Sequence, residues 1–182
     1  IIRVETGGDG YRRALFAASP RLGSGHLLAA VDVGTNDGPW VRPDGFRKLN
    51  GVLRYSQGSA RSGFSVTGMF YDATWDSTDQ VPLRAVQSGA ISRFGFVDDT
   101  DGGSSHRHSL VAAWQGGGSR SLTRAEGFFS DYAMNLFSNF SYFLADPVNG
   151  DQFEQADDRN VFGWLGEWNR AGTLFDRPTN NT

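Results

Sequence analysis

The feature that most constrains this chain is a period-two alternation of apolar and polar residues, which recurs along almost its whole length. Between residues 47 and 57, one set of alternate positions is Leu49, Gly51, Leu53 and Tyr55, and the other is Lys48, Asn50, Val52, Arg54 and Ser56. Because successive side chains of a β-strand point to opposite faces of a sheet, this pattern predicts a strand with one polar face. A chain built mostly from such segments is predicted to be all-β.

Similar runs predict about eight strands and no convincing helix. They span residues 1–6, 11–18, 26–34, 47–57, 63–75, 106–115, 128–137 and 159–168. Apolar sets are expected at Phe64, Val66, Gly68 and Phe70, at His108, Leu110, Ala112 and Trp114, at Phe128, Tyr132, Met134 and Leu136, and at Phe162, Trp164 and Trp168. The opposite faces are expected to carry Lys48, Asn50, Arg54, Ser65, Thr67, Arg107, Ser109, Asp131 and Asn135.

The segments between these strands alternate between short and long. Short turns are expected near 19–25, 58–62, 116–121 and 169–173, and long loops near 35–46, 76–105 and 138–157. This alternation is typical of outer-membrane barrels, which have short periplasmic turns and long outer loops. If the short turns are periplasmic, Tyr55, Phe64, Trp114 and Trp168 lie near that end and form an aromatic girdle. A soluble antiparallel sheet with one solvent-exposed face would give the same alternation.

Composition excludes several other classes of protein. No apolar run reaches the roughly 18 residues of a membrane-spanning helix, and the chain has no cysteine for disulfides, thiol catalysis or thiolate metal sites. Its net charge is -3, and Lys48 and the scattered arginines form no basic run, so we expect no nucleic-acid partner. The first residues lack the pattern of a signal peptide, which suggests an internal piece or a processed product.

Motifs for catalysis and metal binding are nearly absent, so we expect neither an enzyme nor a cofactor. His106 and His108 flank Arg107 on a predicted strand and share a face, so they could bind a metal. We interpret them instead as residues at an interface or at the base of a loop. The segment 98–103 fails as a calcium loop, since His108 would fall where the twelfth-position acid is needed. We therefore expect no metal site.

Ligand recognition, if present, is expected in the long loops, which combine aromatic rings with positive charge. The candidate ligand-binding residues are Trp40, Arg84, Arg93, Phe94, Phe140 and Tyr142. Nothing in the loops selects one ligand over another.

Several segments, in order along nearly the whole chain, resemble the TonB-dependent outer-membrane receptors. They are Gly7-Gly-Asp-Gly-Tyr-Arg-Arg13, Asn36-Asp-Gly-Pro-Trp40, Arg47-Lys-Leu-Asn-Gly-Val-Leu-Arg-Tyr-Ser56, Asp79-Gln-Val-Pro-Leu-Arg-Ala-Val86, Ile91-Ser-Arg-Phe-Gly95, Asp99-Thr-Asp-Gly-Gly103, Leu136-Phe-Ser-Asn-Phe140 and Asp146-Pro-Val-Asn-Gly-Asp-Gln-Phe-Glu154. The similarity is to the early strands of that family's barrel, immediately after its plug domain.

The resemblance implies that residues 1–182 are one partial domain, an antiparallel transmembrane segment that forms an open sheet from a 22-stranded barrel. It also implies energised uptake of a chelated metal, vitamin or glycan across the bacterial outer membrane. The implied partners are outer-membrane lipid, the plug domain of the same parent chain, a periplasmic energy-coupling protein and the small-molecule substrate.

Two alternatives stay open at this stage. The chain could be a complete small eight-stranded outer-membrane barrel with an adhesion or structural role, which the length allows. It could also be a soluble carbohydrate-binding β-sheet domain. Pairing between the first and last strands would favour the small barrel, whereas a second layer over the apolar face would favour the soluble domain.

Overall fold

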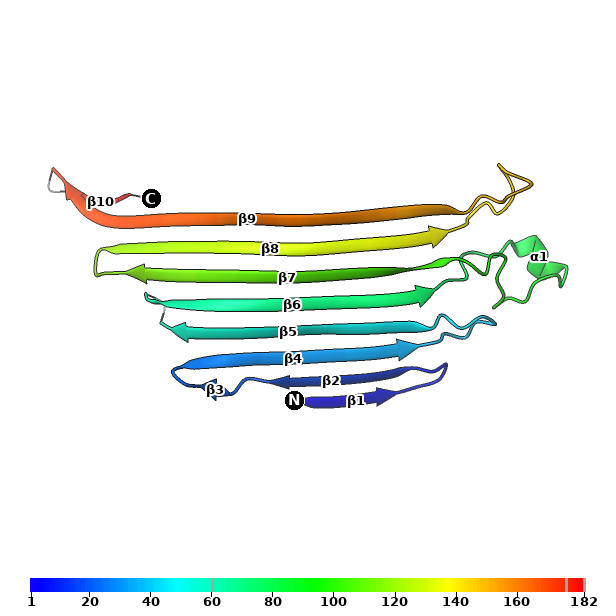
Figure 1. The fold of residues 1–182 in the computed structure, drawn as a ribbon, viewed down its shortest axis with the longest axis horizontal. Coiled ribbons are helices and arrows are strands. Elements are labelled where there is room, and N and C mark those ends of the chain that lie inside the picture. The colour runs from blue at the N-terminus through cyan, green and yellow to red at the C-terminus, as the bar shows by residue number, and fades with distance from the viewer. Residues whose placement is uncertain (60, 176, 182) are drawn as a thin grey trace.

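Long antiparallel strands dominate the computed structural model, which describes residues 1–59, 61–175 and 177–181 (Figure 1). The strands are β1 (Ile2–Thr6), β2 (Arg12–Ala18), β3 (Arg21–Leu22), β4 (Gly25–Asn36), β5 (Phe46–Gly58), β6 (Gly63–Asp76), β7 (Gly102–Gly117), β8 (Ser121–Ser138), β9 (Phe153–Leu174) and β10 (Arg177–Asn181). All pair antiparallel in one sheet of order β1-β2-β4-β5-β6-β7-β8-β9-β10, and β3 pairs with β4.

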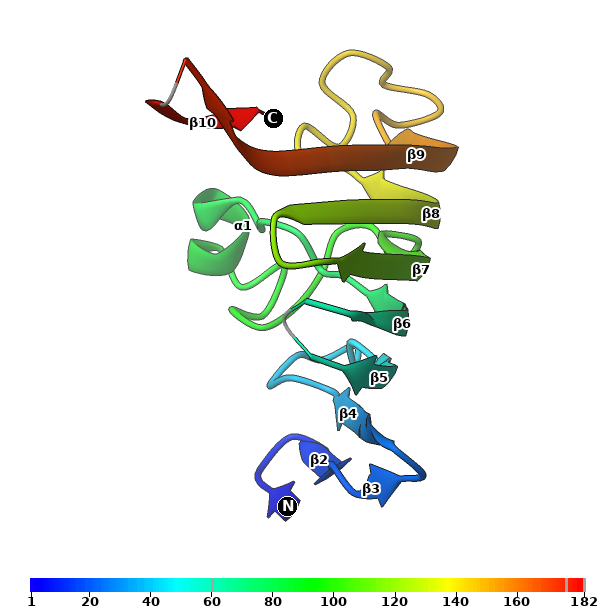
Figure 2. The same cartoon turned by 90° about the vertical axis from the view of Figure 1, so that its left-hand side faces the viewer.

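The sheet is open, because β1 and β10 lie at its opposite edges and do not pair with each other within the described residues. The prediction of an open all-β antiparallel sheet is therefore confirmed. Figure 2 shows a single layer of strands, with no second sheet among the residues drawn in colour. The small closed barrel would require pairing between its first and last strands, and that ladder is absent from this part of the chain.

The long connections, 37–45, 77–101 and 139–152, gather at one end of the sheet together with the short β1–β2 connection at 7–11, and the other short connections lie at the opposite end (Figure 1). Two expectations about these segments were wrong. Residues 169–173 are not a turn but part of β9, because β10 pairs with residues 170–174 and keeps the backbone extended. The long loop 77–101 contains a single helical turn, α1 (Leu83–Gln87), where we expected no helix. Among the described residues, no helix is long and apolar enough to cross a membrane.

The strand register assigns every side chain to one of two faces. We name the face that carries Leu53 the apolar face and the face that carries Arg54 the polar face. Leu49, Leu53, Tyr55, Phe64, Val66 and Phe70 share the apolar face, as predicted, because β5 and β6 pair Gly51 with Phe70 and Tyr55 with Val66. Trp114 and Trp168 lie on the same face through the pairs Phe64–Trp114 and Thr123–Trp168.

The faces predicted for β8 were reversed. Leu110 pairs with Phe129, so the apolar face of β8 carries Phe129, Asp131 and Asn135. The polar face carries the expected apolar set Phe128, Tyr132, Met134 and Leu136. The adjacent rings at 128 and 129 make the alternation of this strand ambiguous, and only pairing with β7 resolves it.

No protein layer covers the apolar face. Trp164 is 85% exposed and Phe162 is 81% exposed. The only apolar side chain that is buried among the described residues is Ala73. An isolated sheet of this kind has no hydrophobic core, so its stability in water alone cannot come from burial of this face.

The apolar face is a band with a polar border on the side of the long loops. The first polar residues beyond the band on β4 to β9 are Thr35, Arg47, Asp72, His108, Asp131 and Asn160. Below them the band covers about seven residues of each strand, or roughly 23 Å along the strand.

The band crosses the strands obliquely. The centre of the band lies at the level of Ala30 on β4 and of Leu165 on β9. The register of the sheet, followed from strand to strand, places Val161 of β9 at the level of Ala30, so the centre of the band is displaced by four residues on β9. This displacement is roughly 13 Å along the strand over roughly 24 Å across the sheet, an angle of roughly 30°. If the band marks the plane of a membrane, the strands are tilted by this angle from the membrane normal. The angle is close to the tilt of strands in membrane barrels.

The ring of Phe70 lies over Gly51, its partner on β5, where a Cβ atom would collide with the ring. Gly51→Val is expected to lower the free energy of unfolding by about 1–3 kcal/mol, because the ring must leave a favourable position. Gly68→Val is the matched control on the same face, since a Cβ there meets nothing nearer than the Leu53 carbonyl oxygen at 4.0 Å. Urea unfolding in detergent measures both, and equal costs would contradict the proposed steric conflict.

Candidate functional site

The polar face is a surface of paired charges. Asp32 on β4 accepts hydrogen bonds from Arg13 Nη2 at 2.8 Å and from Lys48 Nζ at 3.4 Å. Further along the sheet, the guanidinium carbons of Arg107 and Arg159 lie 5.1 Å and 4.9 Å from the ring centroid of Tyr132. Such charged and partly exposed groups are typical of a surface in contact with water.

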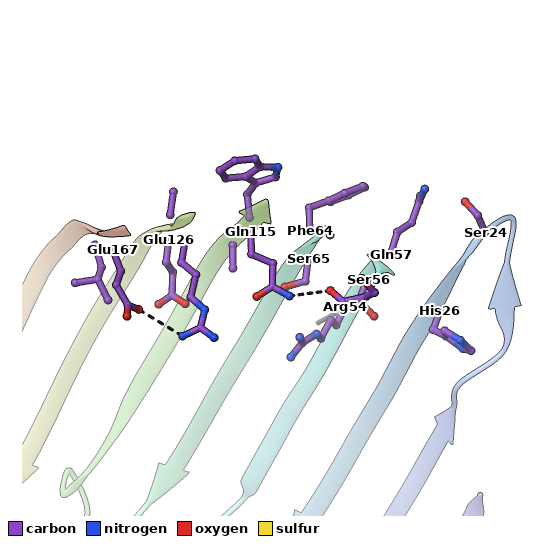
Figure 3. Close-up of a pocket in the computed structure, with 18 of the residues that line it drawn as sticks. Ser24, His26, Arg54, Ser56, Gln57, Phe64, Ser65, Gln115, Glu126 and Glu167 are labelled. Atoms are coloured by element: carbon purple, nitrogen blue, oxygen red, sulfur yellow. Dashed lines mark hydrogen bonds and ion pairs between the residues drawn. The ribbon is translucent and has the colours of Figure 1, made fainter. Parts of the chain in front are cut away.

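A hollow of about 630 Å³ lies on the polar face at the end with the short turns. Its lining includes Arg54, Ser65, Gln115, Arg124, Glu126 and Glu167 (Figure 3). Arg124 Nη1 lies 3.4 Å from Glu167 Oε2, and Gln115 Nε2 donates to the Ser59 carbonyl oxygen at 2.8 Å. The hollow offers charges of both signs, so it can contact a polar ligand or another polar segment of protein.

The long loops bring three of the candidate ligand-binding residues together. The rings of Trp40 and Phe94 lie 6.0 Å apart between centroids, and the guanidinium carbon of Arg93 lies 5.9 Å from the Phe94 centroid. Val41 N donates to the Phe94 carbonyl oxygen at 2.9 Å, which fixes loop 37–45 against loop 77–101. Trp40, Arg93 and Phe94 therefore form one exposed aromatic and cationic group.

The other three candidates are Arg84, Phe140 and Tyr142. In the described structure, none of them contacts the group formed by Trp40, Arg93 and Phe94. Arg84 is exposed on α1. Phe140 packs its ring 5.4 Å from that of Phe153. Tyr142 has a positive φ of 61° and a buried hydroxyl without a hydrogen-bond partner. The three residues therefore do not form one site with Trp40, Arg93 and Phe94.

Asn139 joins loop 139–152 to loop 77–101 and is only 2% exposed. Its backbone N donates to Asp79 Oδ2 and its Nδ2 donates to Asp98 Oδ2, both at 2.9 Å. Its Oδ1 accepts a bond of 2.7 Å from Tyr142 N. No local pattern in the sequence indicated this structural role of Asn139.

Asp101 is the most buried carboxyl group in the described chain, at 1% exposed. Its Oδ1 accepts from Gln152 Nε2 at 3.1 Å, and its Oδ2 has no partner. Burial, with the nearby negative charges of Asp98 and Asp79, raises the pKa of Asp101 to about 6. The sequence analysis considered this residue only as part of the segment 98–103, which fails as a calcium loop.

The loops are expected to open more readily at pH 7.5 than at pH 4.5. The pKa of Asp101 in the folded protein exceeds the ordinary value of 3.8. The contribution of Asp101 to the stability of the folded loops is therefore complete below pH ~4 and decreases up to pH ~6, by at most about 3 kcal/mol. Amide exchange in loop 77–101 measures this change. Asp101→Asn keeps the acceptor for Gln152 and should remove the pH dependence; an unchanged dependence would assign it to another group.

His106 and His108 lie on the apolar face of β7, at the polar border. Their rings stack, with centroids 4.9 Å apart and an interplanar angle of 15°. Neither histidine belongs to the loop group or to the hollow on the polar face.

Comparison with family models, with curated proteins and with solved structures finds no match. A functional interpretation of the chain must therefore rest on its own residues and on the geometry described above.

Proposed function

We propose that this chain forms part of the barrel wall of a TonB-dependent outer-membrane receptor, which takes up a scarce substrate such as a chelated metal, a vitamin or a glycan. The observation that carries the proposal is the apolar face, which has exposed aromatic rings and no protein layer over it. Contact with a bilayer would remove such a face from water, which supports the proposal.

Three features of the sheet support a membrane barrel. The oblique band matches tilted strands, and its height of roughly 20 Å after correction for tilt suits a thin outer membrane. The aromatic residues Tyr55, Phe64, Trp114 and Trp168 lie near the short turns, where a girdle is expected. The paired charges of the polar face suit a water-filled lumen and contact with a plug domain.

The family assignment rests on the resemblance described above, and the open sheet is compatible with it. An open sheet has unpaired edges, which further strands of a 22-stranded barrel would cover. In this receptor, the long loops would capture the substrate through groups such as Trp40, Arg93 and Phe94. The plug of the parent chain and a periplasmic energy-coupling protein would complete transport.

Quenching of tryptophan fluorescence by brominated lipids tests the bilayer contact. Variants that retain one tryptophan, either Trp164 on the apolar face or Trp40 in a loop, are refolded into lipid vesicles with bromines near the middle of the acyl chains. We expect strong quenching of Trp164 and little quenching of Trp40. Equal quenching of the two would contradict insertion of the apolar face.

Labelling on intact cells tests the orientation and the compartment, and these 182 residues contain no cysteine of their own that would react. In the parent protein, Val148→Cys places a thiol in a long loop, where Val148 is 84% exposed, and Ser119→Cys places one in a short turn. A membrane-impermeant maleimide should label Val148→Cys on intact cells and Ser119→Cys only after lysis. The reverse result, or labelling of neither on intact cells, would overturn the proposed placement.

A further inference from the structure

We propose that His106, His108 and Asp131 bind one transition-metal dication of the Zn²⁺ type at the polar border of the apolar face. The register of the sheet brings these residues together. His106 and His108 are two positions apart on β7, and Asp131 of β8 is the direct partner of His108. Sequence reasoning placed Asp131 on the other face, so it found the two histidines without their third ligand.

The distances suit one small ion. His106 Nε2 lies 2.9 Å from Asp131 Oδ2, and His108 Nδ1 lies 3.8 Å from the same oxygen. One ligand atom from each of the three residues falls within 4.8 Å of the others. Because the side chains are one-third to one-half exposed, small rotations can bring all three atoms to the roughly 2.0–2.2 Å that zinc ligands adopt.

Asp72 orients one of the ligands. Its two carboxylate oxygens each lie 3.2 Å from His108 Nε2, so this nitrogen can donate a proton to Asp72 while Nδ1 faces Asp131. A carboxylate that holds the second nitrogen of a metal-bound histidine is a recurrent feature of zinc sites, where it fixes the tautomer of the ring. Asp72 is therefore a positioning residue rather than a ligand.

The donor set selects the class of metal. Two imidazole nitrogens and one carboxylate oxygen suit Zn²⁺, Ni²⁺ or Cu²⁺, whereas Ca²⁺ and Mg²⁺ prefer oxygen ligands alone. Three protein ligands leave a fourth position of a tetrahedral ion for water or another small ligand. This inference requires only the strand register, so it does not depend on the proposed receptor function.

Calorimetric titration with zinc chloride tests the site. The 182-residue chain is stripped of metal, refolded in zwitterionic detergent at pH 7.5 and titrated after circular dichroism has verified its β-structure. We expect one equivalent to bind with micromolar affinity. His106→Ala and Asp131→Asn should each weaken binding more than tenfold, and Asp72→Asn should weaken it by about tenfold.

His26→Ala is the matched control, since His26 is the third histidine of the chain and lies on the polar face of β4. It should leave the affinity unchanged. Cobalt chloride provides a second readout, because a tetrahedral cobalt site absorbs visible light and this absorption should disappear in His106→Ala. Absence of binding in the wild-type chain, or equal loss in His26→Ala and His106→Ala, would overturn the site while the lipid-quenching result stood unaffected.

Discussion

Replacement of Leu53 by arginine is expected to destabilise the protein in a bilayer by about 2–4 kcal/mol. Leu53 lies near the centre of the apolar band on β5 and is 54% exposed, and its partners on the neighbouring strands, Ala29 and Gly68, carry no charge. At the middle of a bilayer the guanidinium would be surrounded by acyl chains, which solvate a charge poorly. Reversible unfolding with denaturant from lipid vesicles measures the change.

Arg54→Leu is the matched control, because Arg54 is the next residue of the same strand and points to the opposite face. It lines the hollow on the polar face, where water can replace it, so the expected cost is within about 0.5 kcal/mol. In water without lipid, the two substitutions should differ little. Equal costs in lipid, or a larger cost for Arg54→Leu, would show that the faces are reversed or that the sheet does not contact a bilayer.

Asn139→Leu is expected to lower the free energy of separating loop 139–152 from loop 77–101 by about 2–4 kcal/mol. The sheet should stay folded. The substitution removes the donor to Asp98 and the acceptor for Tyr142 N. Each buried group left without its partner costs about 1–3 kcal/mol. Amide exchange should accelerate in residues 77–101 and 139–152, and the amides of β5 and β6 should keep their protection.

Asn149→Leu serves as the control for this loop, since Asn149 is exposed and bonds only locally to Asp146. It should leave exchange in loop 77–101 unchanged. If Asn139→Leu also left that loop unchanged, Asn139 would not join the two loops in solution. A loss of substrate binding together with loop release, in the parent protein, would support the role of the loops in capture.

Most of the sheet could be predicted from the sequence, because strands with one wet face leave a period-two pattern in residues such as Leu49, Leu53 and Tyr55. The failures have physical causes. Rings at both Phe128 and Phe129 remove the alternation of β8, so its facing depends on the partner strand. Asn169, Arg170 and Gly172 have the composition of a turn. Pairing of Asn169 with β8, and of Arg170 and Gly172 with β10, keeps them extended.

The candidate sites were predicted less completely, because they depend on contacts between distant segments. Trp40 and Arg93 were predicted as loop residues, but their meeting around Phe94 depends on how two loops pack. The structural role of Asn139 and the burial of Asp101 leave no local pattern. The two histidines were visible on one face of a strand, whereas their partner Asp131 required the register of β7 and β8.

The unequal edges of the sheet have a consequence for how assembly could be observed. Among the described residues, β9 pairs with β8 along most of its length, but with β10 only at residues 170–174. Along residues 153–168, alternate backbone N–H groups of β9 consequently have no strand to donate to within the described part of the chain. Amides of β9 should exchange with solvent in a fast and slow alternation. A neighbouring strand that docks there would convert this alternation into uniform protection, so β9 would serve as a residue-by-residue reporter of sheet extension.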